Sequence, residues 1–121
     1  MKRAVNKTNP RLGNLITMLK EASRINEANI WREIAKRLES PGRNFAEVNV
    51  SKINRYAHPG ETILVPGKVL GSGVLTQSVV VAALNFSDAA SSKIEQANGR
   101  CISIEDLVRD NPNGSRVRIL R

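Results

Sequence analysis

The hydrophobic pattern of the chain changes at Gly60, and this change constrains the fold more than any other feature. Before Gly60, apolar residues recur at helical spacing; after it, they gather in short, β-branched runs separated by turn residues. Two further helical segments interrupt these later runs. The pattern therefore predicts a mixed α/β fold, with helices first and a strand-rich unit after them.

Three helices are expected before Gly60. Asn9 is a suitable N-cap and Pro10 a suitable first residue for the first helix. The second is expected over residues 28–39, and the third is expected to start with Ser51 as its cap and to end before residues 58–60. The apolar stripe of the first helix consists of Leu12, Leu15, Ile16, Leu19 and Ala22. That of the second helix consists of Ile30, Trp31, Ile34, Ala35 and Leu38.

Strands and capped helices are expected to alternate after Gly60. The β-branched runs predict strands at residues 63–65, 68–70, 79–84, 101–104 and 117–120. Ser87 is the expected cap of a helix over residues 88–97, and Ser103 with Asp106 has the spacing of a capping box for a helix over residues 104–110. We expect one domain over residues 1–121, comprising a flexible basic tail (1–8), a helical part (9–60) and a strand-and-helix part (61–121).

The charge of the chain points to a polyanionic partner. Lys and Arg outnumber Asp and Glu by 19 to 11, giving a formal net charge of +8, and the isoelectric point is near 10.4. The excess is concentrated: residues 1–60 hold twelve basic and five acidic residues, and the first twenty residues hold no acid. Nucleic acid is the partner that such a concentrated cationic surface favours.

A glycine-rich segment, "VPGKVLGSGVL" at residues 65–75, suggests a nucleotide-phosphate loop. However, the P-loop spacing fails because Thr62 stands where its first glycine would be, and the dinucleotide fingerprint fails at Thr76. A type II turn at Pro66-Gly67 accounts for the segment better, with Gly71 and Gly73 allowing a tight turn or a close approach. A contact of this loop with a sugar-phosphate backbone, beside Lys68, remains an alternative.

The sequence holds little that suggests catalysis or a metal. The single histidine, His58, lies in a turn, and the single cysteine, Cys101, lies in an apolar run typical of a small buried side chain. We expect no enzyme activity, no cofactor and no metal. No apolar run is long enough to span a membrane, and no secretory signal is evident, so we expect a cytoplasmic protein.

Several cations are candidates for phosphate contacts. Lys2, Arg3, Lys7 and Arg11 lie in the acid-free N-terminal run. Arg32 and Lys36 lie opposite the apolar stripe of the second helix, although pairing of Glu33 with Arg37 and of Glu39 with Lys36 would make part of this group a solvated face. The candidates near the C-terminus are Arg116, Arg118 and Arg121, and no acid lies among the residues after Asp110. In an extended strand, Arg116 and Arg118 would project from the same face.

Four blocks of sequence resemble one family. "KTNPRL" (7–12), "KRLESPGRNFAEVNVSKINRYA" (36–57), "VPGKVLGSGVL" (65–75) and "NPNGSRVRILR" (111–121) are similar, in this order, to the archaeal and eukaryotic large-subunit ribosomal protein eighteen. The chain lacks the extensions of the eukaryotic members, which favours an archaeal source. The resemblance leaves the roles of residues 1–6 and 91–100 open.

The resemblance implies a fold related to the C-terminal part of universal ribosomal protein fifteen. In it, the N-terminal tail and helices pack on an irregular (β-β-α) superhelical unit of short strands and helices. It also implies a non-catalytic role in the large subunit, with ribosomal RNA and neighbouring ribosomal proteins as partners. The residues that it implies as RNA contacts are Lys7, Thr8, Asn9, Arg11, Arg43, Lys52, Arg55, Lys68, Arg116 and Arg118. A free-standing RNA- or DNA-binding regulator and a small nucleotide-binding enzyme are the alternatives.

Overall fold

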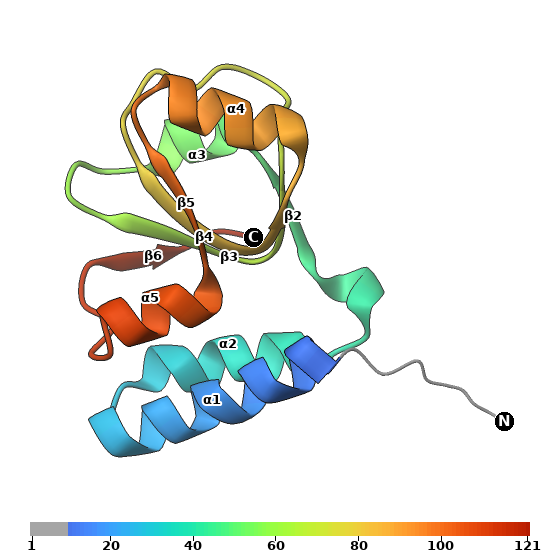
Figure 1. Ribbon diagram of the computed structural model, residues 1–121, viewed down its shortest axis with the longest axis vertical. Helices are drawn as coiled ribbons and strands as arrows, with labels where there is room; N and C mark the ends of the chain where they lie inside the picture. Colours follow the sequence, from blue (N-terminus) through green and yellow to red (C-terminus); the bar gives the residue numbers. More distant parts are fainter. Residues whose placement is uncertain (1–9) are drawn as a thin grey trace, which may run out of the picture.

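The computed structural model describes residues 10–121, which form five α-helices, one turn of 3-10 helix and five strands (Figure 1). The helical segments are α1 (Pro10–Asn26), α2 (Asn29–Glu39), η1 (Gly42–Asn44), α3 (Val50–Tyr56), α4 (Asp88–Gln96) and α5 (Ile104–Asp110). The strands are β2 (Ala46–Asn49), β3 (Thr62–Leu70), β4 (Val80–Phe86), β5 (Arg100–Ser103) and β6 (Val117–Ile119). The predicted mixed α/β class is confirmed.

All the strand pairs in the described part of the chain are parallel, and β3 is their centre. The sheet order is β2-β3-β4-β5, and β6 pairs with β3 as well. β2 lies along the C-terminal half of β3, from Gly67 to Leu70, and β6 lies along its N-terminal end, from Thr62 to Leu64. Two short strands therefore pair with different stretches of one long strand.

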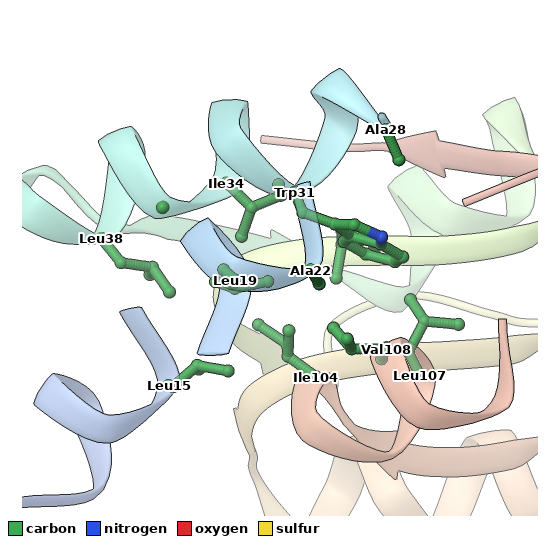
Figure 2. Packing of buried hydrophobic residues seen from close by; sticks show 13 residues of the cluster. Leu15, Leu19, Ala22, Ala28, Trp31, Ile34, Leu38, Ile104, Leu107 and Val108 are labelled. Carbon is green, nitrogen blue, oxygen red and sulfur yellow. The ribbon is translucent and has the colours of Figure 1, made fainter. Parts of the chain in front are cut away.

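The helices form a layer on each face of this sheet (Figure 1). On one face, α1, α2 and α5 bury a cluster that includes Trp31, Leu64 and Ala82. In Figure 2, Leu19 and Trp31 point toward the α5 side chains Ile104 and Val108. On the other face, α3 and α4 pack their own apolar side chains against the alternate residues of the strands. The buried members of this second cluster are Val48, Val50, Ile53, Ile63, Val65, Val69, Val79, Val81, Ala83, Ala90, Ile94 and Leu120.

The helix caps after Gly60 are as predicted, whereas the third helix differs. The Ser87 hydroxyl accepts a hydrogen bond from the Ala90 N–H at 3.1 Å, and the Ser103 hydroxyl accepts one from the Asp106 N–H at 3.0 Å. α3 begins at Val50 rather than after Ser51, so the predicted Ser51 cap is wrong. α1 begins at Pro10, and the predicted N-cap, Asn9, lies outside the described residues.

The predicted type II turn at Pro66-Gly67 is wrong, because both residues lie inside the continuous strand β3. Gly67 is absent from the glycines with positive φ, the conformation that such a turn requires. The pairing of β3 with β4 instead shifts register between Val65 and Lys68, as at a β-bulge. A Cβ at Gly67 would overlap the backbone of Ala46 in β2, so this glycine permits close strand approach.

The segment from Gly71 to Val79 is a crossover rather than a tight turn. It carries the chain from the C-terminal end of β3 to the start of its parallel neighbour β4 without an intervening helix. A Cβ at Gly71 would overlap Ala89 in α4, and one at Gly73 (φ +94°) would overlap Ser51 in α3. The glycines therefore let the crossover lie directly against the two helices.

Candidate nucleic-acid interface

Several backbone groups of the glycine-rich crossover are bound within the protein, which argues against a phosphate cradle. The Ser72 N–H donates to Asn49 Oδ1 at 3.1 Å, and the Thr76 N–H donates to Asn54 Oδ1 at 3.0 Å. Lys93 Nζ donates to the carbonyls of both Gly71 and Gly73, at 2.6 Å each. A phosphate loop needs unbound N–H groups that point at the ligand.

Lys68 belongs to a different surface, a groove beside the C-terminal end of β3. The groove has a volume of about 320 Å³, and Lys68 and Arg43 both line it. Both side chains are exposed, and neither makes a hydrogen bond or an ion pair within residues 10–121. The other lining residues are Gly42, Phe45, Ala46, Glu47, Gly67, Leu84 and Asn85.

A second and larger basic groove lies between α1 and α2. Its volume is about 590 Å³, and Lys20, Arg24, Arg32, Lys36 and Glu39 contribute its charged lining. Lys20 Nζ pairs with the Glu39 carboxylate at 2.6 Å, so Glu39 does not neutralise Lys36 as its sequence position suggested. The groove therefore holds four cations against one carboxylate.

The pair predicted between Glu33 and Arg37 of α2 is present. Arg37 Nη2 lies 2.9 Å from Glu33 Oε2, an i,i+4 ion pair on one helix. Arg32 and Lys36, in contrast, are exposed and have no partner in the described region. Only part of the positive charge on α2 is therefore neutralised by an acidic residue of the same helix.

Two of the predicted RNA-contact arginines form ion pairs between distant segments. Arg11 donates to both carboxylate oxygens of Glu105, at 3.0 and 3.1 Å, and to the Leu84 carbonyl at 2.9 Å. Arg118 donates to both oxygens of Glu61, at 2.8 and 3.3 Å. The hydrogen bond from each arginine holds the pKa of its carboxylate partner below the usual value for glutamate.

Lys52 and Arg116 are also bound to protein groups. Lys52 Nζ donates to the backbone carbonyl of Arg121 at 2.5 Å, and Arg116 Nε donates to the carbonyl of Gly60 at 3.0 Å. Arg116 has a φ of +58° and precedes β6. The expectation that Arg116 and Arg118 project together from one extended strand is therefore wrong, because Arg116 lies before the strand and its backbone is not extended.

The predicted RNA-contact residues thus divide into three groups. Six are exposed cations whose side chains have no partner in the described region: Arg32, Lys36, Arg43, Arg55, Lys68 and Arg121. Four are bound to protein groups: Arg11, Lys52, Arg116 and Arg118. Five lie outside the described residues: Lys2, Arg3, Lys7, Thr8 and Asn9.

The prediction missed two further exposed cations that lack a partner, Arg24 and Arg100. Arg24 is four residues after Lys20 on α1, and this spacing places both on the helix side that borders the second groove. The helical periodicity could therefore have found Arg24. Arg100 opens β5 and has no comparable signal.

The described residues 10–121 offer no evident metal site, and their single cysteine is partly buried. This region holds no group of three or more His, Cys, Asp or Glu side chains that could hold a metal ion. Cys101 packs against the second hydrophobic cluster, and burial raises the pKa of its thiol above the usual value for cysteine. None of the helices from α1 onward is long and apolar enough to cross a membrane.

A basic α/β chain with unpaired surface cations has the make-up of a ribosomal protein, and comparison with known proteins assigns the chain to that class. The family model described as "Ribosomal protein 60S L18 and 50S L18e" matches residues 1–121, and the chain belongs to this family. The family resemblance seen in the sequence is confirmed.

Archaeal relatives named "Large ribosomal subunit protein eL18" match along nearly their full length. The protein of Methanoregula boonei is 71% identical over 121 residues, which cover 100% of both chains. That of Archaeoglobus fulgidus is 55% identical over 114 residues (94% of this chain, 97% of the relative). That of Haloarcula marismortui is 51% identical over 117 residues (97% and 100%).

Proposed function

We propose that the protein is a non-catalytic structural component of the large ribosomal subunit that binds and stabilises folded large-subunit ribosomal RNA. Its partners are this RNA and neighbouring ribosomal proteins, and it works in the cytoplasm, within the ribosome. Family membership supports the place of the protein in the large subunit. The nature of the contacts is argued from the side chains.

The observation that carries the binding mode is the set of exposed cations that the protein does not neutralise. Arg24, Arg32, Lys36, Arg43, Arg55, Lys68, Arg100 and Arg121 make no side-chain hydrogen bond or ion pair within residues 10–121. When such side chains bind phosphates, they release counterions condensed on the RNA, and this release favours binding. The groove between α1 and α2 gathers three of them on one surface.

Salt dependence of RNA binding tests this mode directly. If about six phosphates are engaged, the logarithm of the affinity for large-subunit ribosomal RNA should fall against the logarithm of salt with a slope of about −4 to −5. Replacing Arg32 with Gln should make the slope shallower by about 1, because one phosphate contact is lost. Filter binding at several salt concentrations provides both numbers.

Arg109→Gln is the matched control, because Arg109 is exposed but already pairs with Asp106 at 3.0 Å. This control should leave the slope unchanged. A salt-independent affinity would overturn the phosphate mode. Sedimentation of the protein away from the large-subunit peak in a sucrose gradient of cell lysate would favour a free-standing regulator instead.

The nucleotide-enzyme alternative rests on the glycine-rich segment, and no observation now supports it there. The backbone N–H groups of Ser72 and Thr76 are bound to asparagine side chains, and Lys68 lies on another surface. Calorimetry should therefore detect no heat of binding when ATP, GTP or NAD is added to the protein.

A further inference from the structure

The groove that contains Arg43 and Lys68 differs in chemistry from the basic groove between the helices. Besides its two cations it has an amide, Asn85, a carboxylate, Glu47, and an aromatic ring, Phe45. Its volume of about 320 Å³ is at the lower end of the range of ~300–1,000 Å³ that is typical of small-molecule sites. The groove is therefore of a size for one nucleotide rather than for a double helix.

We propose that this groove receives a single unstacked nucleotide of the RNA, with its base against Phe45 and its phosphate held by Arg43 and Lys68. The inference rests on the proposed RNA-binding function and names the part of the RNA that this surface takes. Proteins that read RNA by sequence stack splayed-out bases on aromatic rings and hydrogen-bond their exposed edges.

The polar side of the groove is a row of side chains across three strands. Glu47 of β2 is the register partner of Lys68 of β3, and Lys68 is the register partner of Asn85 of β4. All three residues are exposed, and none of their side chains makes a hydrogen bond or an ion pair within residues 10–121. Adjacent strands place such a row within reach of one small ligand.

This row offers the hydrogen-bonding groups that a base edge needs. An asparagine amide provides a donor and an acceptor, and a carboxylate accepts from an amino group. Glu47 and Lys68 are register partners but form no ion pair, so the carboxylate of Glu47 is available to a ligand. A carboxylate repels phosphates, so Glu47 would weaken a surface that binds phosphates alone.

The apolar side of the groove is held in place by the fold. Phe45 and Leu84 are partly buried and pack against the first hydrophobic cluster. The Phe45 N–H donates to the Gly42 carbonyl at 3.0 Å, which fixes the turn that carries the ring. The chain leaves this turn directly into β2, beside the sheet (Figure 1).

A second small hollow, of about 120 Å³, extends this surface toward the start of α1. It shares Phe45, Leu84 and Asn85 with the groove, and Arg11 forms part of its wall. Because Arg11 donates to the Leu84 carbonyl at 2.9 Å, the β4 side of the groove is also fixed. A pre-formed site loses less entropy on binding than one that must first be ordered.

Chemical probing of the RNA in assembled large subunits tests the proposal. Subunits would be isolated from cells whose only copy of the protein carries Phe45→Leu, which keeps an apolar side chain in the cluster. We expect the base edges of one or two nucleotides to become several-fold more reactive than in wild-type subunits. Tyr56→Leu, which alters an exposed aromatic residue on α3, is the matched control and should leave these nucleotides unchanged.

Asn85→Ala gives a second variant that does not touch the hydrophobic cluster, and it should expose the same nucleotides as Phe45→Leu. A density map of the wild-type subunit should also show a base in van der Waals contact with the Phe45 ring, at about 4 Å. RNA backbone alone, a protein segment or solvent in the groove would overturn the inference. Absence of the protein from the subunits would instead overturn the proposed function.

Discussion

At the scale of single residues, the cations of this protein fall into two sets. One set holds the fold together: Arg11 joins α1 to α5 through Glu105, and Lys93 holds the crossover through two carbonyls. The other set, which includes Arg32 and Lys68, is exposed and has no partner within residues 10–121. Replacing a member of the first set should reduce stability, and replacing a member of the second should reduce RNA binding.

The pair of Arg11 and Glu105 predicts a specific pH dependence of stability. Glu105→Gln should lower the free energy of unfolding at pH 7 by about 0.5–1 kcal/mol, because the pair is partly exposed to solvent. The folded-state pKa of Glu105 is lowered, so its contribution is complete above the unfolded value of about 4.5 and is lost as the pH falls through the folded value. Urea denaturation at a series of pH values should show the two proteins converging below about pH 4.5.

Glu21→Gln is the control for this experiment, since Glu21 is exposed and makes no ion pair within the described chain. It should stay within about 0.5 kcal/mol of the wild type. A difference between Glu105→Gln and the wild type that persists undiminished at pH 2 would contradict the assignment.

Lys93→Met should destabilise the protein by about 1.5–3 kcal/mol, because the carbonyls of Gly71 and Gly73 lose a charged donor. Thermal unfolding followed by circular dichroism provides the measurement. Lys68→Met removes the same charge from an exposed side chain without a partner, and its melting temperature should remain close to that of the wild type.

The candidate site could be predicted only in part, for a physical reason. Local sequence identifies which stretches are rich in cations, but it does not identify partners that lie far along the chain. Arg118 looked unopposed among the last residues, yet it pairs with Glu61, 57 positions earlier. Conversely, the groove of Arg43 and Lys68 depends on the pairing of β2 with β3, and β2 was not among the predicted strands.

At the scale of the elements, β3 organises the sheet, because three strands pair with it. At Gly67, β3 lies so close to β2 that an added methyl group would overlap the Ala46 backbone. The helices were predictable from nearby residues, such as the caps Ser87 and Ser103. β2 was not predicted, since "AEVN" is only four residues long, with two apolar and two polar residues, and its pairing with β3 joins segments far apart in the sequence.

Gly67→Ala should therefore destabilise the protein by about 1–3 kcal/mol, the usual cost of overpacking. Gly13→Ala is the opposite case, because nothing lies within 4 Å of the added methyl group and Gly13 is inside α1. It should stabilise the protein by about 0.5–1 kcal/mol. Chemical denaturation of the two variants measures whether the free energy of unfolding falls in the first and rises in the second. Destabilisation of similar size in both would contradict this account of Gly67.

At the scale of the whole molecule, the helical and strand-rich halves share one hydrophobic cluster. Leu15 and Trp31 come from the first half, and Leu64, Ala82 and Ile104 come from the second. The Trp31 indole N–H also donates to the Pro112 carbonyl at 2.7 Å, which links α2 to the loop before β6. This sharing supports the expectation that the chain is one domain.

One cooperative unfolding transition should follow from the shared cluster. Trp31 is the only tryptophan, so its fluorescence reports on the helical half, whereas far-ultraviolet circular dichroism reports on all elements. In urea, the two signals should change with the same midpoint. Two separate midpoints would mean that the halves unfold independently.

The placement of β6 has a consequence for how the protein is made. β6 pairs with the N-terminal end of β3, and the adjoining Leu120 is buried in the second cluster. Among the described strands, β6 is nevertheless the last to be translated. During synthesis, every other element can emerge while that stretch of β3 still lacks its neighbour. The finished sheet therefore forms only after residues 117–120 have left the exit tunnel, and a nascent chain stalled before that point should be open to proteases.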